Sequence, residues 1–443
     1  MDTPICDFVE NYIEQDCLRL HMPGHKGESF LGIEKFDITE ISGADSLYQA
    51  SGIIKKSEEI ASEIFGAHTF YSASGSSLCI RAMLYLAMLL NKNKSGKPYV
   101  IAGRNAHKAF LSATALLDFD IEWICGKDSY LSCEICPRKL DEMLLAAKDK
   151  PFAVYVTSPD YLGNICDIKS ISSVCRKHNV LLIVDNAHGA YLKFLKKSMH
   201  PIDLGADMCC DSAHKTLPVL TGGAYLHISE NSDMYLVRKA KDAMLLFGST
   251  SPSYLILQSL DKANVYLQSY TKRLEDFLPD IKTLKANLIG RGFELAGTEP
   301  LKLTVMPKSY GYTGHEFADE LRKHNIECEF CDPDYVVLMF TPEIGAEGIK
   351  KTLKAFGEIK KKDAVLKTPP EIKVKEKVMS VRQAYFSLQE ECDVKNSIGK
   401  ILADSMIGCP PAVSVVLCGE RVDESDVKCF EYYGINKVKV VKE

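Results

Sequence analysis

The sequence predicts an α/β protein built on a mostly parallel, doubly wound sheet and continued by smaller α/β domains. Three observations predict this fold class. From about residue 70 to 230, short apolar runs alternate with helical patterns. These runs are almost continuously hydrophobic, as expected of strands that are buried on both faces of a sheet. Further strand and helix patterns follow residue 300, so we expect the chain to continue beyond the large sheet.

Each element follows from its local pattern. The strands predicted for the large sheet are residues 98–103, 120–125, 152–157, 180–185, 206–212 and 223–228, with helices that include 76–90 and 168–177. A long helical stretch, 253–290, leads to a smaller unit with strands 301–306 and 335–340 and helices 315–323 and 346–356. The last unit is predicted to contain helix 397–405, strand 412–417, helix 423–433 and strand 437–441.

These patterns predict five parts. A Lys-rich stretch with a Pro-Pro step reads as a linker before the last unit. The expected parts are an N-terminal segment (1–68), a large domain (69–262), a small α/β domain (263–358), the linker (359–378) and a C-terminal domain (379–443).

Composition excludes several classes of protein. The 443 residues are 46% apolar and 26% charged, as in ordinary globular proteins. A net charge of −5 gives no attraction to nucleic acid or to an anionic membrane. The longest apolar run, 82–90, is too short to span a bilayer, and the N-terminus lacks the regions of a signal peptide. We therefore expect a cytoplasmic protein.

The sixteen cysteines are scattered through predicted strands and helices, which favours reduced and partly buried thiols over a disulfide framework. Two CxxC pairs occur, Cys133/Cys136 and Cys328/Cys331, and each offers half of a zinc site. Nearly two hundred residues separate the pairs, and prolines follow both. We expect structural cysteines and no metal site.

Lys215 is the first candidate for chemistry. It follows the predicted strand ADMCC in the loop DSAHKTLP, at a carboxyl strand end, where open α/β sheets bind their ligands. A lysine in a partly dry pocket can form an imine with an aldehyde cofactor, here pyridoxal 5'-phosphate (PLP). By itself, the loop is equally compatible with an ordinary surface lysine.

Two further features fit the same cofactor. Asp185 ends the apolar strand LLIVD and can pair with the protonated pyridine nitrogen of PLP, although a helix-capping aspartate would look the same. Gly75, Ser76 and Ser77 open a helix, which suits a phosphate, although such residues are also common caps. The order of phosphate loop, Asp185 and, thirty residues later, Lys215 favours a PLP enzyme.

Several longer motifs carry a resemblance. They are HMPGHKG (21–27), DITEISGADSL (37–47), RNAHKAF (104–110), VDNAHGA (184–190), DSAHKTLP (211–218), STSPSYLILQSLD (249–261), PLKLTV (300–305), YTGHEFADEL (312–321) and CPPAVSVVLCGERV (409–422). In these the sequence resembles the Orn/Lys/Arg decarboxylase family in its short bacterial form, within the fold-type-I (aspartate aminotransferase-like) PLP enzymes. The resemblance implies that fold and the decarboxylation of a basic amino acid.

The resemblance also implies residue roles around the phosphate and the ring. Ser76 and Ser77 would bind the phosphate, helped by Ser212. His107 would stack on the pyridine ring with its edge toward the substrate carboxylate; the alternative is a helix-start histidine bonded to backbone. Asp185 would hold the pyridinium nitrogen, and Ala187 would pack under the ring.

At the reacting end, Lys215 would form the internal aldimine, with His214 beside it as a proton donor. Thr250 would reach the phosphate of the other subunit, because the family builds its sites across a homodimer interface; a plain turn is the alternative. A higher homo-oligomer is left open.

In the implied reaction, the Cα–carboxylate bond stands perpendicular to the ring, CO₂ leaves, and Asp185 stabilises the quinonoid. Lys215 or His214 then protonates Cα, giving agmatine or a diamine. Two alternatives stay open: an aminotransferase of the same fold and a catalytically silent PLP-binding regulator. The late arginines, Arg322, Arg382 and Arg421, lie in no recognisable carboxylate clamp, which disfavours the aminotransferase.

The substrate is open among arginine, lysine and ornithine, and analogy with short stand-alone relatives favours arginine. Asp45, Glu420 or an acid of the partner subunit are candidates to bind its distal cation, although each is equally an ordinary acid. The sequence departs from the family pattern at two places, and the second lies in the C-terminal unit, which the resemblance implies helps to close the substrate pocket. HMPGHKGES lacks a second glycine, and Cys418 replaces a proline before Gly-Glu.

Overall fold

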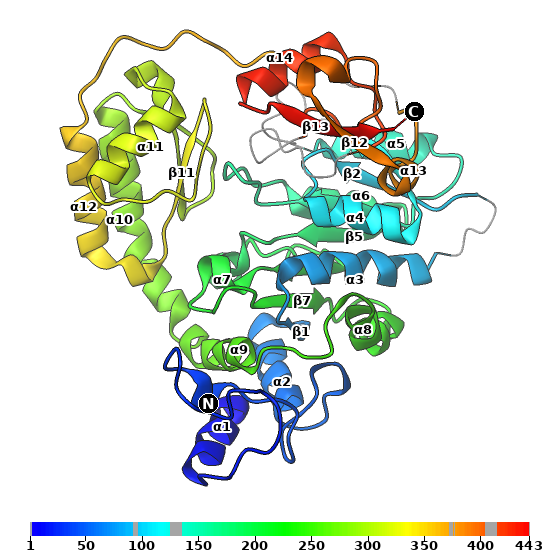
Figure 1. Cartoon of the computed structure of the whole chain (residues 1–443), viewed down its shortest axis with the longest axis vertical. Coiled ribbons are helices and arrows are strands. Elements are labelled where there is room, and N and C mark those ends of the chain that lie inside the picture. The colour runs from blue at the N-terminus through cyan, green and yellow to red at the C-terminus, as the bar shows by residue number, and fades with distance from the viewer. Residues whose placement is uncertain are drawn as a thin grey trace. The chain divides into compact units, whose positions relative to one another are not determined.

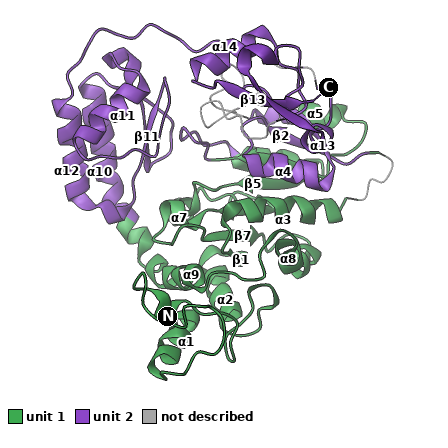
Figure 2. Ribbon diagram, in the orientation of Figure 1, with its two compact units in different colours: residues 1–96, 141–158, 168–273 green, residues 97–140, 159–167, 274–443 purple. Residues whose placement is uncertain are grey.

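The structure is a computed structural model that describes residues 2–91, 96–124, 135–371, 375, 377–403 and 414–442. The chain divides into two compact units, shown in Figure 2. Unit 1 comprises residues 1–96, 141–158 and 168–273, and unit 2 comprises residues 97–140, 159–167 and 274–443. The finer five-part division expected from the sequence stays a prediction.

Unit 1 is built on a sheet whose strands are almost completely buried. Its described residues form five strands in the spatial order β1-β7-β6-β5-β4. Their bounds are β1 His68–Ser72, β4 Ala153–Thr157, β5 Leu181–Asp185, β6 Met208–Asp211 and β7 Ala224–Ile228. Strands β4, β5 and β6 run parallel, whereas β7 pairs antiparallel with both β6 and β1.

The register of these strands gathers chain ends at one edge of the sheet. Thr157 of β4 pairs with Asp185 of β5, and Asp185 pairs with Cys210 of β6. Because β7 is antiparallel to β6, its first residue lies at this same edge, and so does the last residue of β1, which pairs with it. The edge therefore collects the residues that follow β1, β5 and β6, which include most of the predicted site.

Helices cover this sheet for reasons visible in their sequences. Helix α3 is apolar on nearly every side and is buried against α8 and β7. Helices α1, α2 and α9 pack together (Figure 1). The Asp261 side chain of α9 accepts hydrogen bonds from the backbone N–H groups of Ile5 and Cys6, both at 3.0 Å. The bounds are α1 Pro4–Glu14, α2 Ile53–Phe65, α3 Gly75–Leu89, α6 Ile168–Lys177, α7 Ala213–Thr216, α8 Met234–Phe247 and α9 Tyr254–Leu267, with 3₁₀ turns η1 Glu34–Phe36, η2 Leu47–Gln49 and η3 Ala190–Phe194.

Unit 2 contains a parallel pair, β2 (Tyr99–Gly103) and β3 (Asp120–Ile124), joined by helix α4 (Lys108–Leu117). It also contains an antiparallel sheet in the order β10-β11-β9-β8, with α11 and α12 packed around Phe293, Phe317 and Phe356. The bounds are β8 Glu294–Ala296, β9 Lys302–Met306, β10 Phe330–Cys331, β11 Val336–Met339, α11 Gly314–Lys323 and α12 Gly345–Glu358, with η4 Pro307–Tyr310 and η5 Pro342–Ile344. Helices α5 (Pro137–Ala146) and α10 (Tyr270–Gly290) cross from one unit to the other.

The end of the chain forms a small apolar cluster between α14 (Glu424–Tyr432) and an antiparallel pair, β12 (Gln389–Asp393) and β13 (Lys437–Val441). Helix α13 (Val381–Phe386) and the 3₁₀ turn η6 (Val394–Ser397) complete its elements. Helix α14 begins with a capping box of Asp423 and Asp426. Helix α14 and strand β13 confirm the last helix and the last strand predicted from the sequence.

Two sequence predictions were wrong in detail. Residues 397–403 form no helix: η6 ends at Ser397, Gly399 adopts φ +82°, and Ile401 and Leu402 form isolated bridges to Arg421 and Val440. Residues 414–417 form no strand, and residues 404–413 lie outside the described residues. The helical stretch predicted over 253–290 is confirmed and consists of two helices, α9 and α10. At Ile401 and Leu402, pairing with residues distant in sequence replaces the expected helix.

The predicted strands and helices of the large sheet are confirmed within one or two residues, apart from residue 125, which lies outside the described residues. The cysteines described are free thiols, and Cys79, Cys175, Cys209 and Cys210 are among those buried. No described helix has both the length and the apolar character that crossing a membrane requires.

Candidate active site

The start of helix α3 provides the candidate phosphate site. Gly75 adopts φ +69°, its N–H donates to the carbonyl of Gly222 at 2.7 Å, and the space where its Cβ would stand is open. The N-cap, Ser74, makes no side-chain cap, so the first turn of α3 presents its amides toward that space. Ser76 is buried and Ser77 half-buried on this turn. The geometry suits a phosphate.

A hydroxyl pair joins this helix start to the lysine loop. Ser212, the N-cap of α7, donates from Oγ to Oγ of Ser76 at 2.8 Å, and both side chains are buried. Of the predicted phosphate-binding residues in unit 1, the structure therefore brings together Ser76, Ser77 and Ser212. Their spacing in the sequence could not show this contact.

Asp185 ends β5 and is 2% exposed. Its carboxylate accepts hydrogen bonds from the Tyr155 hydroxyl at 3.1 Å, the Ala187 N–H at 3.2 Å and the Cys210 thiol at 3.7 Å. Burial and the nearby Asp185 charge raise the pKa values of Tyr155 and Cys210, which keeps both groups protonated as donors. An acid so positioned can hold a protonated ring nitrogen.

The turn after Asp185 is tight and buried. The Gly189 N–H donates to the Asn186 carbonyl at 2.7 Å, and a Cβ on Gly189 would stand 2.0 Å from Oδ1 of Asn186. No α-helix follows Asp185, so the helix-capping interpretation does not hold for this residue; its bond to Ala187 is an Asx turn. Ala187 and His188 are buried in this turn.

Lys215 lies in the short helix α7 and is half-buried. Its Nζ stands 3.0 Å from Nε2 of His188, which belongs to the turn after Asp185. Sequence reasoning missed His188, although the motif VDNAHGA contains it. The available signal was its distance of three residues from Asp185 at a carboxyl strand end.

His214 precedes Lys215 and is half-buried. Its Nδ1 and its backbone nitrogen both face the carbonyl of Gly223, at 3.0 and 3.2 Å. Since a carbonyl oxygen only accepts hydrogen bonds, Nδ1 carries the proton in that contact, and Nε2 is the nitrogen that can exchange a proton with a ligand. Its expected role as a proton donor to substrate stays a prediction.

For two further predicted residues, His107 and Thr250, the structure describes the local surroundings. His107 belongs to unit 2, where it is the N-cap of α4 and its Nδ1 accepts the Ala109 N–H at 3.2 Å. This bond matches the alternative of a helix-start histidine, and stacking on the ring stays a prediction. Thr250 is exposed just after α8, and its expected contact with another subunit also stays a prediction.

The two acids considered for the substrate's distal cation have structural roles instead. Asp45 is buried and accepts N–H bonds from Ser51, Gly52 and Ile54, at 3.0, 2.7 and 3.2 Å, so that it anchors the start of α2. In unit 2, Glu420 forms a buried bidentate ion pair with Arg104, with both contacts at 2.8 Å. Buried carboxylates need such partners, and neither is set up for a ligand.

Unit 2 also explains other sequence features. Cys418 is buried against Ala115, Val381 and Ala384, so this departure from the family pattern lies in an apolar cluster. The late arginines have local partners: Arg322 pairs with Asp319, Arg382 donates to the Ala115 carbonyl, and Arg421 donates to the Gly399 carbonyl.

Of the two CxxC pairs, the structure describes Cys136, Cys328 and Cys331. Sγ of Cys331 lies 3.5 Å from Nδ1 of His315, and burial raises the pKa of Cys328 to about 11. Cys133, of the other pair, lies outside the described residues.

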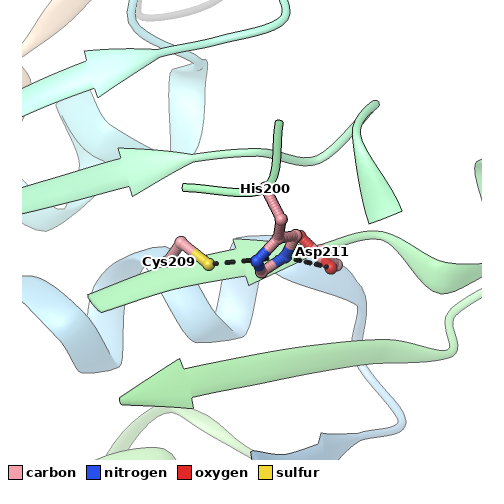
Figure 3. A group of neighbouring side chains, drawn as sticks. All are labelled: His200, Cys209 and Asp211. Carbon is pink, nitrogen blue, oxygen red and sulfur yellow. Dashed lines mark hydrogen bonds and ion pairs between the residues drawn. The ribbon is translucent and has the colours of Figure 1, made fainter. Parts of the chain in front are cut away.

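A second polar cluster lies at the end of β6, four residues before Lys215. Asp211 ends β6 with no exposed surface and accepts hydrogen bonds at Oδ2 from Nε2 of His200 (3.1 Å) and of His227 (3.2 Å). Its Oδ1 accepts from Nδ2 of Asn186 at 2.6 Å. Burial opposes its ionisation, but the two imidazoles hold its pKa well below the usual range. Figure 3 shows Cys209 beside His200, with Sγ 3.9 Å from Nε2.

Comparisons with known proteins place this chain among similar sequences and structures. The uncharacterized protein YaaO of Bacillus subtilis (strain 168) is 29% identical over 97% of this chain and 93% of its own length. An arginine decarboxylase of Halalkalibacterium halodurans is 27% identical, over 96% of this chain and 92% of its own. Among solved structures, the Francisella novicida lysine decarboxylase LdcF superposes with a TM-score of 0.82, covering 99% of this chain and 81% of its own at 15% identity.

The constitutive lysine decarboxylase of Escherichia coli gives a TM-score of 0.76 over 100% of this chain and 82% of its own, at 16% identity. These likenesses confirm the α/β fold of the fold-type-I PLP enzymes. The model of the Orn/Lys/Arg decarboxylase major domain matches residues 3–303, and that match covers Ser76, His107, Asp185, Lys215 and Thr250. The chain therefore belongs to the Orn/Lys/Arg decarboxylase family, PLP-dependent enzymes that decarboxylate basic amino acids.

Proposed function

We propose that this chain binds PLP at the sheet edge of unit 1 and decarboxylates arginine to agmatine. The observation that carries the proposal is the grouping of three features at that edge: the open start of α3, the buried carboxylate of Asp185, and Lys215 beside His188. The donor set fits each end of PLP, with amides and hydroxyls for the phosphate, an acid for the ring nitrogen and an amine for the aldehyde.

The chain's residues divide the chemistry. When bound, PLP supplies the sink for the electron pair that CO₂ leaves behind. Asp185, fixed by Tyr155 and Cys210, keeps the ring nitrogen protonated. His188 accepts a proton from Nζ of Lys215 and so favours the neutral, nucleophilic amine. Lys215, or His214 through Nε2, returns a proton to Cα of the product.

Arginine is the proposed substrate because relatives that align along almost the whole chain carry the name arginine decarboxylase, including those of H. halodurans and B. subtilis. The carboxylate that would bind the guanidinium is not Asp45 or Glu420, since both are engaged. We propose that an acid of a partner subunit meets it.

The decisive experiment measures CO₂ release from arginine, lysine and ornithine in parallel, with purified protein supplemented with PLP. We expect release from arginine to be the fastest of the three. Faster release from lysine or ornithine would reject arginine as the substrate but would still support decarboxylation as the reaction. Release from none, together with amino transfer to a keto acid, would favour the aminotransferase.

A second experiment tests the cofactor assignment. Borohydride reduction should fix PLP covalently to the peptide that contains Lys215, and Lys215→Ala should lose both this label and the visible absorbance. The matched control is Lys197→Ala, an exposed lysine of the same unit. A label on any other peptide would reject the assignment.

We also propose that the protein is a homodimer. In unit 1, residues 18–33 expose large apolar side chains, among them Leu18 and Leu31 at 84% each, with Leu20, Met22 and Phe30. Such an apolar stretch is typical of an interface. Sedimentation equilibrium should give a dimer, and the double change Leu18→Asp, Leu31→Asp should give monomers. A monomeric wild type would contradict the proposal.

A further inference from the structure

We propose that His200, Cys209 and Asp211, with His227 as the fourth ligand, form a buried zinc site behind the lysine loop. The ligand atoms of His200, Cys209 and Asp211 all lie within 4.8 Å of one another (Figure 3). Nε2 of His227 lies 3.2 Å from the Asp211 carboxylate. This site goes beyond the decarboxylase activity, which uses the opposite end of the same loop.

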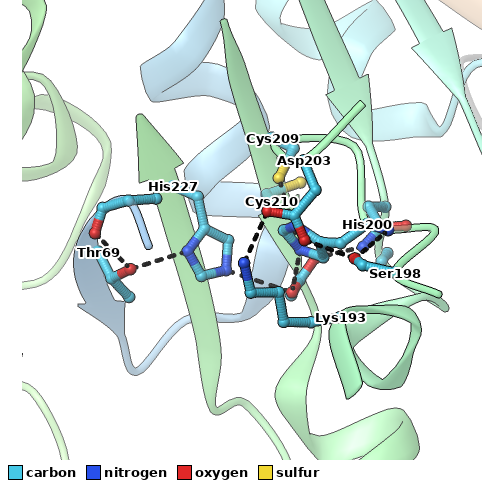
Figure 4. Close-up of polar contacts among 12 residues, drawn as sticks. Thr69, Lys193, Ser198, His200, Asp203, Cys209, Cys210 and His227 are labelled. Atoms are coloured by element: carbon cyan, nitrogen blue, oxygen red, sulfur yellow. Dashed lines mark hydrogen bonds and ion pairs between the residues drawn. The ribbon is translucent and has the colours of Figure 1, made fainter. Parts of the chain in front are cut away.

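The fold brings these side chains to one face. Cys209 and Asp211 are two residues apart on β6, so both point to the same side of the sheet. His227 on β7 is the register partner of Cys209, which places it beside them. His200 lies in the segment that follows η3. Hydrogen bonds from Lys193 and Ser198 to the Asp203 carboxylate hold this segment in place (Figure 4).

The separations suit a tetrahedral zinc ion. Bonds of about 2.0–2.3 Å to zinc place neighbouring ligand atoms about 3.3–3.8 Å apart. Here Nε2 of His200 lies 3.1 Å from the Asp211 oxygen and 3.9 Å from Sγ of Cys209. Both of these separations lie within a few tenths of an ångström of that range. The nitrogen and sulfur donors favour zinc over calcium or magnesium.

Outer contacts orient two of the ligands. Nδ1 of His227 contacts Oγ1 of Thr69 at 2.9 Å, which directs Nε2 toward the cluster. Nδ2 of Asn186 binds Oδ1 of Asp211 at 2.6 Å and leaves Oδ2 toward the histidines. Figure 4 shows Thr69, His227 and His200 in this arrangement.

Charge also favours a divalent ion. All four side chains are fully buried, where an uncompensated charge is costly. One carboxylate and one thiolate balance Zn²⁺, and two neutral imidazoles complete the ligand set without adding charge. Such a closed site has no position for substrate and would be structural. The zinc ion would join three parts of the chain: β6, which ends shortly before Lys215, β7, and the segment that contains His200.

The test is the zinc content of the purified full chain. Because the site is closed, the metal must be present while the protein folds, so cells are grown with added zinc and the protein is then dialysed against a chelating resin. Elemental analysis should find about one zinc ion per chain. Protein grown with cobalt instead should show the near-ultraviolet charge-transfer band of a cobalt–thiolate bond.

Cys209→Ser should abolish the cobalt–thiolate band, and His227→Gln should lower the zinc content. The matched controls are Cys175→Ser, a buried thiol on helix α6, and Cys328→Ser, which removes one thiol of a half-buried CxxC pair. Should Cys209→Ser fail to fold, the wild-type zinc content decides alone. Zinc below about 0.1 per chain, or a band lost only with Cys328, would overturn the proposal and leave a hydrogen-bonded cluster.

Discussion

At the scale of the residue, the site depends on protons held by close neighbours. Lys215 is useful as a nucleophile only when neutral, and His188 at 3.0 Å is the group that can take its proton. The Asp185 carboxylate accepts three hydrogen bonds, from the Tyr155 hydroxyl, the Ala187 N–H and the Cys210 thiol, which fix its position at the end of β5. The proposed chemistry therefore depends on contacts of single side chains, and substitutions of single residues test it.

His188→Gln should slow CO₂ release by about 10²–10⁴-fold, the range that one positioned acid–base group contributes. The PLP label on Lys215 should survive, because the lysine itself is intact. The measurement is kcat against pH, whose acidic limb should move in the variant. His324→Gln, a half-buried histidine of unit 2, is the control. A rate within twofold of the wild type would remove His188 from the mechanism.

Asp332 gives a pH dependence of stability. Burial raises its pKa to about 7 from an ordinary value of 3.8, with Asp334 adding to the effect and two backbone N–H bonds opposing it. The folded state thus binds its proton more tightly, so stability from this group is full below about pH 4 and is lost as pH rises through 7. The loss is on the order of 4 kcal/mol.

Asp332→Asn should remove this dependence. The asparagine keeps the oxygen that accepts N–H bonds from Asp334 and Tyr335 at 2.7 Å, but it cannot ionise. Thermal unfolding at pH 5 and pH 8 should show the variant gaining stability relative to the wild type as pH rises. An unchanged difference between the two pH values would contradict this account.

At the scale of the element, a short turn at a strand end links two strands of the candidate site. The turn after β5 packs Asn186 against Gly189 so closely that no side chain fits, and the same Asn186 binds Asp211 at the end of β6. Two strand ends are thereby fixed to each other. This contact also fixes the spacing between Asp185, the last residue of β5, and Lys215, which follows β6.

Gly189→Ala should lower the free energy of unfolding by about 1–3 kcal/mol, since its Cβ would collide with Asn186 Oδ1 and with Leu192. Urea unfolding measures this loss, and weakened PLP absorbance would accompany it. The control is Gly290→Ala, which meets nothing within 4 Å at the end of α10 and should stabilise by up to about 1 kcal/mol. Equal stability of both variants would refute the collision.

At the scale of the whole molecule, contacts between distant segments complete each unit. In unit 2, Arg104 follows β2 and Glu420 precedes α14, yet they form a buried ion pair across 316 residues of sequence. In unit 1, Asp45 and Tyr254 are bonded across 209 residues. Each unit is therefore assembled from segments that no local pattern connects.

Arg104→Met should cost about 3–5 kcal/mol of unfolding free energy, because it leaves the Glu420 carboxylate buried without its partner. The double variant Arg104→Met, Glu420→Leu should recover most of that loss, since no charge is then buried. Denaturant titration of wild type, both singles and the double measures the coupling. Additive losses would show that the pair is not coupled.

The sequence by itself determined the fold class and the order of the strands along the chain, and it predicted the residues of the candidate cofactor site. Nearly continuous apolar runs identify buried strands locally, and Lys215, Asp185 and the Ser76 turn follow those runs at readable positions. The family followed from ordered motifs, and the match to residues 3–303 confirmed it. Periodicity and strand-end position are local properties, so one sequence reveals them.

Only the tertiary structure decided which buried polar groups meet. It paired Lys215 with His188, gathered His200 and His227 on Asp211, and committed Asp45 and Glu420 to structural bonds. It also turned residues 397–403 from an expected helix into bridges with distant strands. The physical reason is that a buried charge or hydrogen bond is satisfied by whatever the fold brings near, and that partner leaves no trace in local periodicity.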